Sequence, residues 1–519
     1  MYLLVSGVFI WLMFPRLGTE IFPTVDAGQF QLRLRAPTGT RIERTELVAL
    51  KALDVIKREA GEANVEISSG FIGVQPASYP INTIYLWTSG PHEAVLLVAL
   101  KPSATLRGEA LKERLRAKLK DELPGTLISF EAGDIVSNVM SFGSPTPIEV
   151  AVQGPALPAN RAHAEKVLAE LAKIPELRDL QYGQALDYPT IDVNIDRERA
   201  GLYGLTMSNV AKSLVAATTS SRFIEPNYWR DPVSGNAFQI QVEIPQHRMA
   251  SIEDMSNLPV MNYGEARPLL GDVATLKLGT AMGVVERYNM QRVVSLTANV
   301  YGKPLGDISG EIRKAIARAG EIPRGITVNI RGQIPALNET IGGLQTGMLL
   351  AIGVIFLLLT ANFQSLRMAI AVIMTVPAVI CGVIISLLIT GSSLNVQSFM
   401  GAIMAVGIAV ANSILLVTFA EMSRKEGASV LDAALEGGRG RMRAILMTAT
   451  AMIAGMIPIA MGQAQTAPLG RAVIGGLVFA TIATLTVLPS FYAVLQSKNK
   501  ADSSSLDPDD PTSKYYERT

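Results

Sequence analysis

A few polar side chains stand inside long apolar segments of this chain, and these residues have the greatest potential for chemistry. Asn412 and Ser413 are adjacent in one such segment, Thr448 lies in another, and Arg441 stands just before the latter. A buried amide within an apolar helix usually pairs with a polar group on a neighbouring helix. We therefore expect Asn412 to make a helix contact or to take part in a proton relay.

Simpler structural explanations exist for the other polar residues. Thr448 could bond only to the backbone of its own helix, and Arg441 could be only a basic anchor beside a membrane. The apolar segments contain no Asp, Glu, Lys or Arg except Arg471, at the start of the last one. The sequence thus places hydrogen-bonding groups in these segments but almost no charge.

Five apolar segments are each long enough to cross a bilayer, which takes about 20 residues. They are residues 341–361, 368–390, 397–420, 444–462 and 471–495. Five such segments in one block predict a transmembrane helix bundle (341–495) rather than the core of a soluble domain. Residues 1–14 are apolar but shorter, with no basic residues before them and no small-residue cleavage site after them. We interpret residues 1–15 as a sixth span, truncated at its start, rather than as a signal peptide.

The distribution of basic residues predicts the orientation of the spans. Segment 421–443 contains five Lys and Arg residues, whereas 391–396 and 463–470 contain no charge. Basic loops stay in the cytoplasm, so 421–443 is expected there and residues 16–336 on the opposite side. The polar tail 496–519 is expected to be disordered and cytoplasmic.

Residues 16–336 alternate strand and helix patterns in two rounds, which predicts an α+β region built from split βαβ units. We place a first subdomain at 16–146 and a second at 147–187 together with 283–336. The piece between, 188–282, interrupts the second unit and is expected to be an inserted subdomain. Its segment 222–245 has the turn residues and β-rich flanks of a long hairpin or extended loop, which is either a docking arm or an ordinary edge hairpin.

The composition excludes several classes of protein. A net charge of +1 gives no reason to expect a nucleic-acid partner. The three histidines have no metal-ligand spacing, and the single cysteine, Cys381, is expected to be a packing residue. We find no phosphate-binding loop, catalytic triad or metal-hydrolase motif, so we expect neither an enzyme nor a bound cofactor.

Four motifs in a fixed order carry a family resemblance. They are PRLGTEIFPTVDAGQF, IDVNIDRERAGLYGLTMSNVAKSL, GIAVANSILLVTFAE and GRGRMRAILMTATAMIAGMIPIAMG. Over nearly its whole length the chain resembles the C-terminal half of resistance–nodulation–division (RND) efflux permeases of the hydrophobe and amphiphile type. That half holds a membrane helix, a periplasmic porter module with an inserted funnel subdomain, and five further helices.

The resemblance implies a setting and partners. Family members are inner-membrane homotrimers with a large periplasmic domain, and they work with a periplasmic adaptor protein and an outer-membrane channel. Their permeases resemble two tandem copies of this plan, whereas this chain has one. The N-terminal half of the pump is therefore an implied partner, and we expect no transport by this chain alone.

The resemblance also implies site residues. In the family's proton relay, two aspartates of the N-terminal half lie opposite a lysine, an arginine and a threonine of the C-terminal half. Arg441 and Thr448 match the arginine and threonine, but the lysine position is Ala411. Asn412 and Ser413 beside it remain polar, so a relay here would depend on carboxylates of the other half.

Segment 66–90 corresponds by resemblance to the loop that lines the drug pocket. It carries four aromatic residues that would offer an apolar surface to varied ligands, Phe71, Tyr79, Tyr85 and Trp87. In the alternative interpretation Tyr85 and Trp87 lie on a strand and pack within the module. No paired methionines occur in the porter segment, which argues against a copper or silver exporter.

The function expected from all this is the C-terminal half of a proton-driven RND efflux permease that exports hydrophobic or amphiphilic compounds. One alternative is a non-transporting assembly or scaffold subunit, or a truncated pump fragment. Another is an RND relative that moves lipids or assists protein export.

Overall fold

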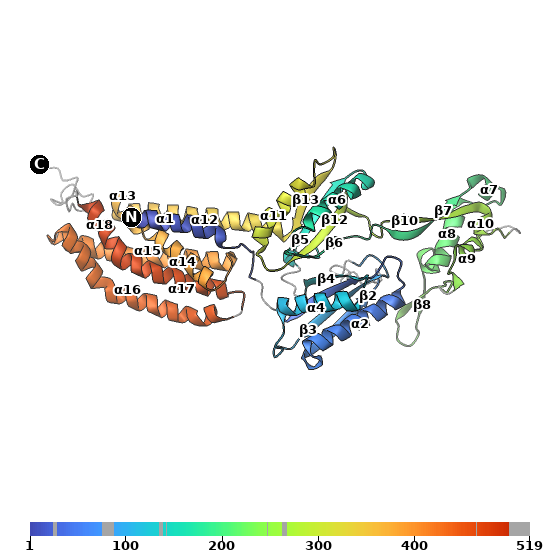
Figure 1. Ribbon diagram of the computed structural model, residues 1–519, viewed down its shortest axis with the longest axis horizontal. Coiled ribbons are helices and arrows are strands. Elements are labelled where there is room, and N and C mark those ends of the chain that lie inside the picture. The colour runs from blue at the N-terminus through green and yellow to red at the C-terminus, as the bar shows by residue number, and fades with distance from the viewer. Residues whose placement is uncertain are drawn as a thin grey trace. The chain divides into compact units, whose positions relative to one another are not determined.

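The computed structural model describes residues 1–497 except for 24–27, 75–87, 134–138, 142, 246–247, 262–266 and 463. The chain forms two compact units. The first comprises Met1–Gly183 with Glu286–Thr519, and the second, Gln184–Val285, is inserted into it. Figure 1 shows the order of the helices and strands along the chain.

The first sheet of the larger unit has four antiparallel strands in the order β2-β3-β1-β4. They are β1 (Gln29–Arg35), β2 (Val65–Ile72), β3 (Glu93–Leu100) and β4 (Leu127–Ala132). Helices α2 (Ile42–Ala60) and α4 (Gly108–Glu122) share one apolar core with this sheet. Side chains alternate between the faces of a strand, so Phe30, Leu32 and Leu34 of β1 enter that core. The polar residues between them lie on the uncovered face.

The second sheet has the strand order β11-β12-β5-β13, and β6 also pairs with β12. The strands are β5 (Ile148–Gly154), β6 (Leu177–Tyr182), β11 (Glu286–Tyr288), β12 (Gln291–Val300) and β13 (Thr327–Gly332). Helices α6 (Leu157–Leu171) and α11 (Leu305–Arg318) pack on one face, where Val150, Leu296 and Ile308 are buried together. As in the first sheet, the alternating polar residues lie on the other face.

Segment 66–90, expected to be a pocket-lining loop, begins as a strand. Most of β2 falls within it, and this strand pairs with β3 along its length. Phe71 therefore sits on an edge strand rather than on a loop. Its Ser-Ser-Gly sequence has weak strand propensity, and the hydrogen-bond ladder to β3 overrides that preference.

The inserted unit is built on a two-stranded ribbon of β7 (Tyr188–Ile195) and β10 (Ala274–Ala281). Its helices are α7 (Arg197–Leu202), α8 (Met207–Thr218), α9 (Ile252–Ser256) and α10 (Leu270–Val273). Val210, Leu270 and Val273 form its core. Strands β8 (Asn227–Arg230) and β9 (Ala237–Ile240) form an antiparallel hairpin whose eight residues are all exposed, as the turn-rich segment predicts.

Within the described part of the chain, five long helices have the length and hydropathy of membrane spans, which confirms the five apolar segments. They are α12 (Gln333–Phe363), α13–α14 (Leu366–Ile389), α15 (Val396–Lys425), α16 (Val430–Met461) and α17–α18 (Ala467–Gln496). The N-terminal helix α1 (Tyr2–Met13), with the short turn η1 (Phe14–Arg16), is apolar but shorter. Segment 421–443, expected to be a loop, is almost wholly helical. Helices α15 and α16 extend beyond their apolar segments because Glu, Lys and Arg are good helix formers outside the bilayer.

A short segment after η1, residues 17–21, joins the second sheet to the bundle, and we call it the strap. The N–H of Glu20 bonds to the carbonyl of Leu394 at 3.0 Å, and the N–H of Gly306 bonds to the carbonyl of Thr19 at 2.9 Å. One apolar cluster runs from the second sheet through α11 and α12 to α14, α15 and α17. The core of the first sheet is a separate cluster. The second sheet is therefore the one tied to the membrane helices.

Candidate functional site: a polar cleft between the two sheets

The uncovered face of the first sheet is a buried ionic network. Arg33 Nε donates to Glu131 Oε1 at 2.6 Å, and Gln31 Nε2 donates to Glu131 Oε2 at 2.7 Å. Arg35 Nε donates to Glu93 Oε1 at 2.7 Å. Arg33, Glu93 and Glu131 are each at most 4% exposed, so each charge needs a partner to remain ionised.

The ionisation of this network follows from opposing effects. Burial raises the pKa of Glu93, but the guanidinium groups of Arg35 and Arg33 together lower it by a larger amount. The pKa of Glu93 is therefore below its usual value. Burial lowers the pKa of Arg33, and the carboxylates of Glu131 and Glu93 more than offset this. Glu93 and Arg33 therefore carry full charges at neutral pH.

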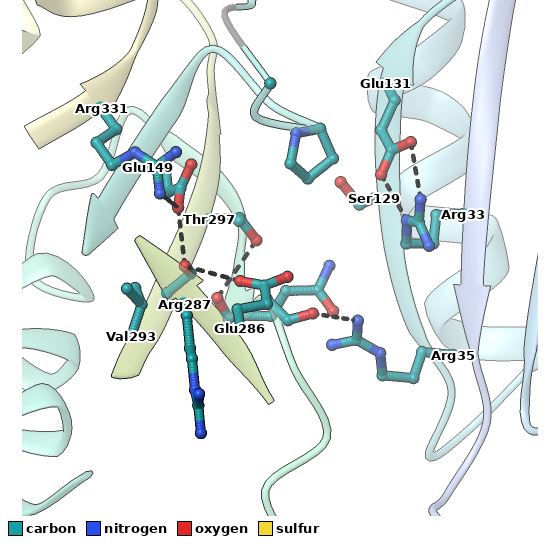
Figure 2. A pocket seen from close by; sticks show the side chains of 15 residues that line it. Arg33, Arg35, Ser129, Glu131, Glu149, Glu286, Arg287, Val293, Thr297 and Arg331 are labelled. Carbon is teal, nitrogen blue, oxygen red and sulfur yellow. Dashed lines mark hydrogen bonds and ion pairs between the residues drawn. The ribbon is translucent and has the colours of Figure 1, made fainter. Parts of the chain in front are cut away.

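The facing side of the second sheet is polar as well. Ser295 Oγ donates to Glu149 Oε1 at 2.8 Å, and Arg331 Nη1 lies 3.2 Å from the same oxygen. Figure 2 shows this group on one wall of the cleft and the Arg33–Glu131 pair on the other. The contacts of Glu149 here come from its own sheet, as those of Glu131 come from the first sheet.

The two sheets meet along a seam between β4 and β6, and Asp179 is its centre. The carboxylate of Asp179 accepts hydrogen bonds from Arg116 Nε at 2.9 Å and Nη2 at 2.8 Å. It also accepts from the backbone N–H of Phe130 at 3.1 Å and from Asn299 Nδ2 at 2.8 Å. Its backbone has a φ of 54°, which few non-glycine residues adopt, and this places the carboxylate toward β4 and α4.

A second link crosses between the sheets away from the seam. Arg35 Nη1 donates to the carbonyl of Tyr182 at 2.6 Å, and Nη2 donates to that of Gly183 at 2.9 Å. Between these links lies a cavity of about 220 Å³. It is lined by Arg33, Arg35, Ser129, Glu131, Gly143, Pro145, Glu149, Gln181, Gly183, Glu286, Arg287, Val293, Ser295, Thr297 and Arg331. Charges of both signs and hydroxyl groups dominate this lining, so it suits a polar or ionised group.

The membrane residues singled out from the sequence lie apart from this cleft. Ser413 is buried on α15, and its hydroxyl donates to the carbonyl of Ala409 at 2.7 Å. It also lies 3.4 Å from the hydroxyl of Thr484. Asn412 is 9% exposed, and its side chain has no hydrogen-bond partner within the described part of the chain. The helix-contact or relay role of Asn412 therefore stays a prediction, whereas its neighbour Ser413 makes a contact with another helix.

Thr448 and Arg441 make only local or cation–π contacts on α16. Thr448 Oγ1 donates to the carbonyls of Ala444 and Ile445 of its own helix, and its relay role stays a prediction. The guanidinium of Arg441 stacks 4.1 Å from the ring centre of Phe419 on α15. Its buried Nε has no acceptor among the residues that the structure describes.

The aromatic pocket expected from the sequence stays a prediction, because most of its residues are not described. Phe71 is half-buried on the edge strand β2 and does not line the cavity. Tyr79, Tyr85 and Trp87 lie outside the described residues. The cleft itself was not predicted from the sequence. The segment QFQLRLR alternates polar or charged residues with apolar ones, and this pattern indicates a strand with one polar face.

The described residues contain five long apolar helices, all of which follow the mixed α/β region, and the shorter apolar helix α1, which precedes it. This arrangement defines a multi-pass membrane protein. The chain belongs to the AcrB/AcrD/AcrF family, whose model matches residues 1–496. This confirms the resemblance to RND efflux permeases.

Curated relatives include pumps for different cargoes. The cobalt-zinc-cadmium resistance protein CzcA of Cupriavidus metallidurans is 27% identical over 518 residues, covering 93% of this chain and 46% of CzcA. The toluene efflux pump membrane transporter TtgB of Pseudomonas putida is 27% identical over 512 residues, covering 96% of this chain and 46% of TtgB. The crystal structure of a heavy metal efflux pump shares the fold, with a TM-score of 0.82 at 23% identity, covering 95% of this chain and 50% of that one. The chain thus spans about half the length of these relatives.

Proposed function

We propose that this chain is the C-terminal half of a proton-driven RND efflux permease of the bacterial inner membrane, and a transporter rather than an enzyme. The family match over residues 1–496 carries the proposal. In this proposal α1 is a sixth span. Each sheet with its two helices is a split-βαβ porter subdomain, and the strand order β2-β3-β1-β4 supports this because two interleaved βαβ units produce it.

The proposed orientation places both sheets and the inserted unit in the periplasm. The support is the set of basic residues at the junction of α15 and α16, which consists of Arg424, Lys425, Arg439, Arg441 and Arg443. Basic residues at span ends mark the cytoplasmic side. The strap and the cleft then face the periplasm.

The polar cleft is proposed to receive the charged end of an amphiphilic substrate. The side chains of each wall bond mainly within their own sheet, so the walls can separate without leaving many buried groups unpaired. Opening breaks the two hydrogen bonds from Arg35 to the carbonyls of Tyr182 and Gly183. The guanidinium groups of Arg35 and Arg331 are then available to an anionic group on the substrate.

A second half-pump is proposed as the partner of the membrane helices. Only 6% of the most apolar stretch of α12 and 11% of that of α16 are buried, against 50% for α15. Gly407 and Ala411 are exposed on α15, and a Cβ on Gly407 would meet no atom within 4 Å. Small residues on an open helix face allow another helix to approach closely. The N-terminal half would cover this face and supply the relay carboxylates. A homotrimer, an adaptor and an outer-membrane channel complete the proposed assembly.

A paired susceptibility assay in a pump-deficient Gram-negative host tests the proposal. One strain expresses this chain alone, and the other expresses it with the gene segment directly upstream. The panel contains a charged amphiphile, toluene, and salts of cobalt and zinc. Resistance to the amphiphile that requires both segments supports the proposal. Export by this chain alone, or resistance only to metals, contradicts it.

A non-transporting assembly subunit is the second candidate. The observation in its favour is the near absence of charged residues from the apolar segments, with Ala411 at the family's lysine position. Such a subunit would co-purify with a complete permease and leave resistance unchanged in both strains, whereas a half-pump would not.

A further inference from the structure

The last span changes its helix type along its length. Helix α17 (Ala467–Ile482) passes into a π-helical turn, η5 (Ala483–Val487), before α18 (Leu488–Gln496). The N–H of Leu488 bonds to the carbonyl of Ala483, five residues back. Pro489 follows at once and has no N–H for an α-helical bond, while its ring crowds the preceding turn. The wider turn is a local consequence of this proline.

Before this turn, α17 packs closely against α15. A Cβ built on Gly401 would lie 2.9 Å from the Cβ of Ala472, and one on Gly476 would lie 2.6 Å from that of Ala405. Contacts this close leave no room for either helix to rotate. The Ser413–Thr484 contact, at 3.4 Å, continues the same register to the start of η5.

Beyond the turn, α18 is oriented by a partly buried polar contact. Tyr492 is fully buried, and its hydroxyl donates to Glu421 Oε1 on α15 at 2.7 Å. Arg424 Nη1 lies 3.4 Å from the same oxygen. The Ser413–Thr484 and Glu421–Tyr492 pairs both join residues 71 positions apart, so the sequence offset at the start of η5 is the same as the offset after it. Apolar contacts are non-directional, whereas this hydrogen bond sets the rotation of α18.

We propose that η5 is a rotational joint in the bundle and that the Tyr492–Glu421 hydrogen bond is its latch. A π-turn holds one residue more than an α-turn, and its conversion to α-helix turns everything after it by about 100°, the rotation of one residue. Pro489 and the latch both oppose that conversion, Pro489 because an α-helical turn would crowd its ring and the latch because it fixes the rotation of α18. Loss of the latch shifts the equilibrium toward the converted form, in which α18 turns while α17 stays fixed. This turn brings Gln496 out of its buried position and carries the exposed Val494 inward. Tyr492 is a positioning residue in this scheme.

Spin labels at two positions of α18 test the joint in the full chain, in lipid nanodiscs and with Cys381 replaced by alanine. Gln496→Cys carries an immobile label and Val494→Cys a mobile one when the latch is made. Tyr492→Phe removes only the hydroxyl, and the loss of a hydrogen bond to a charged group shifts such an equilibrium by about tenfold or more. The mobile fraction should rise about tenfold at position 496 and fall at 494. Glu421→Ala should produce the same pair of changes, and the double variant no more than either alone.

Tyr2→Phe is the matched control, because it removes another tyrosine hydroxyl, one that is partly buried, donates to the carbonyl of Met374 and accepts from the N–H of Ala378. It should leave both labels unchanged. Three results would overturn the joint. The first is unchanged label mobility in Tyr492→Phe and Glu421→Ala, and the second is a rise in mobility at positions 494 and 496 together, which indicates melting rather than rotation. The third is the same response to Tyr2→Phe. None of these measurements depends on transport.

Discussion

The seam between the two sheets should loosen when Asp179 loses its charge. Asp179→Asn suits this test because asparagine tolerates the left-handed backbone that φ 54° requires, so the backbone stays in place. The change replaces one carboxylate oxygen with an NH2 group. That group is a donor and would face the donors of Arg116, Phe130 and Asn299.

The magnitude follows from burial and from the number of donors. The Asp179 side chain is 4% exposed, and it accepts from three different residues. Breaking a buried ion pair by removing one partner destabilises by about 3–5 kcal/mol. Asparagine keeps one acceptor oxygen, so we take the lower end, about 3 kcal/mol. Since about 1.4 kcal/mol is a tenfold change in an equilibrium constant, seam opening should become about 100-fold more frequent.

Amide hydrogen exchange on the full chain measures that opening. Protection of the Phe130 amide and of its neighbours in β4 and β6 should fall by about 100-fold, while α2 and the bundle keep theirs. Asp121→Asn, at an exposed position on α4, is the control and should change protection little. Unchanged protection in β4 and β6 would refute the role of Asp179 as the centre of the seam. An equal loss throughout the chain would show general destabilisation instead.

Three further predictions address the acid response, the strap and the membrane site. The pKa of Glu93 is lowered on folding, so its contribution to stability is complete above the unfolded pKa of about 4.3 and is lost as the pH falls through the folded value. Glu93→Gln should therefore flatten the fall in melting temperature on acidification below about pH 5. Gly18→Ala places a Cβ in steric clash with the ring of Pro304 and should destabilise the chain by about 2 kcal/mol in thermal unfolding. Gly7→Ala, where a Cβ meets nothing within 4 Å, should be neutral or stabilising, and equal effects would refute the packing argument. When the upstream half is present, Asn412→Ala should abolish pH-dependent export with membrane expression unchanged, and undiminished export would remove Asn412 from any relay.

The sequence by itself determined the local elements and the membrane character. Hydrophobic runs of sufficient length located all five long helices, because a bilayer admits few other solutions. Alternation of polar and apolar residues in QFQLRLR located β1, because it reports which face of a strand is buried. The edge strand β2 escaped this signal, since both of its faces are largely exposed. The hydropathy pattern did not predict the ends of α15 and α16, because it reports the length of an apolar segment and not the length of the helix.

Only the tertiary structure decided which polar residues act together. Arg33 and Glu131 are 98 positions apart, and the two ends of the Asn299–Asp179 bond are 120 apart. Periodicity describes the immediate surroundings of a residue, whereas these pairs depend on strand order and on which two faces meet. The same limit applies to Ser413, whose partner Thr484 is presented by a turn that Pro489 distorts. The sequence identified the polar residue on α15, but the fold alone selected the group that it faces.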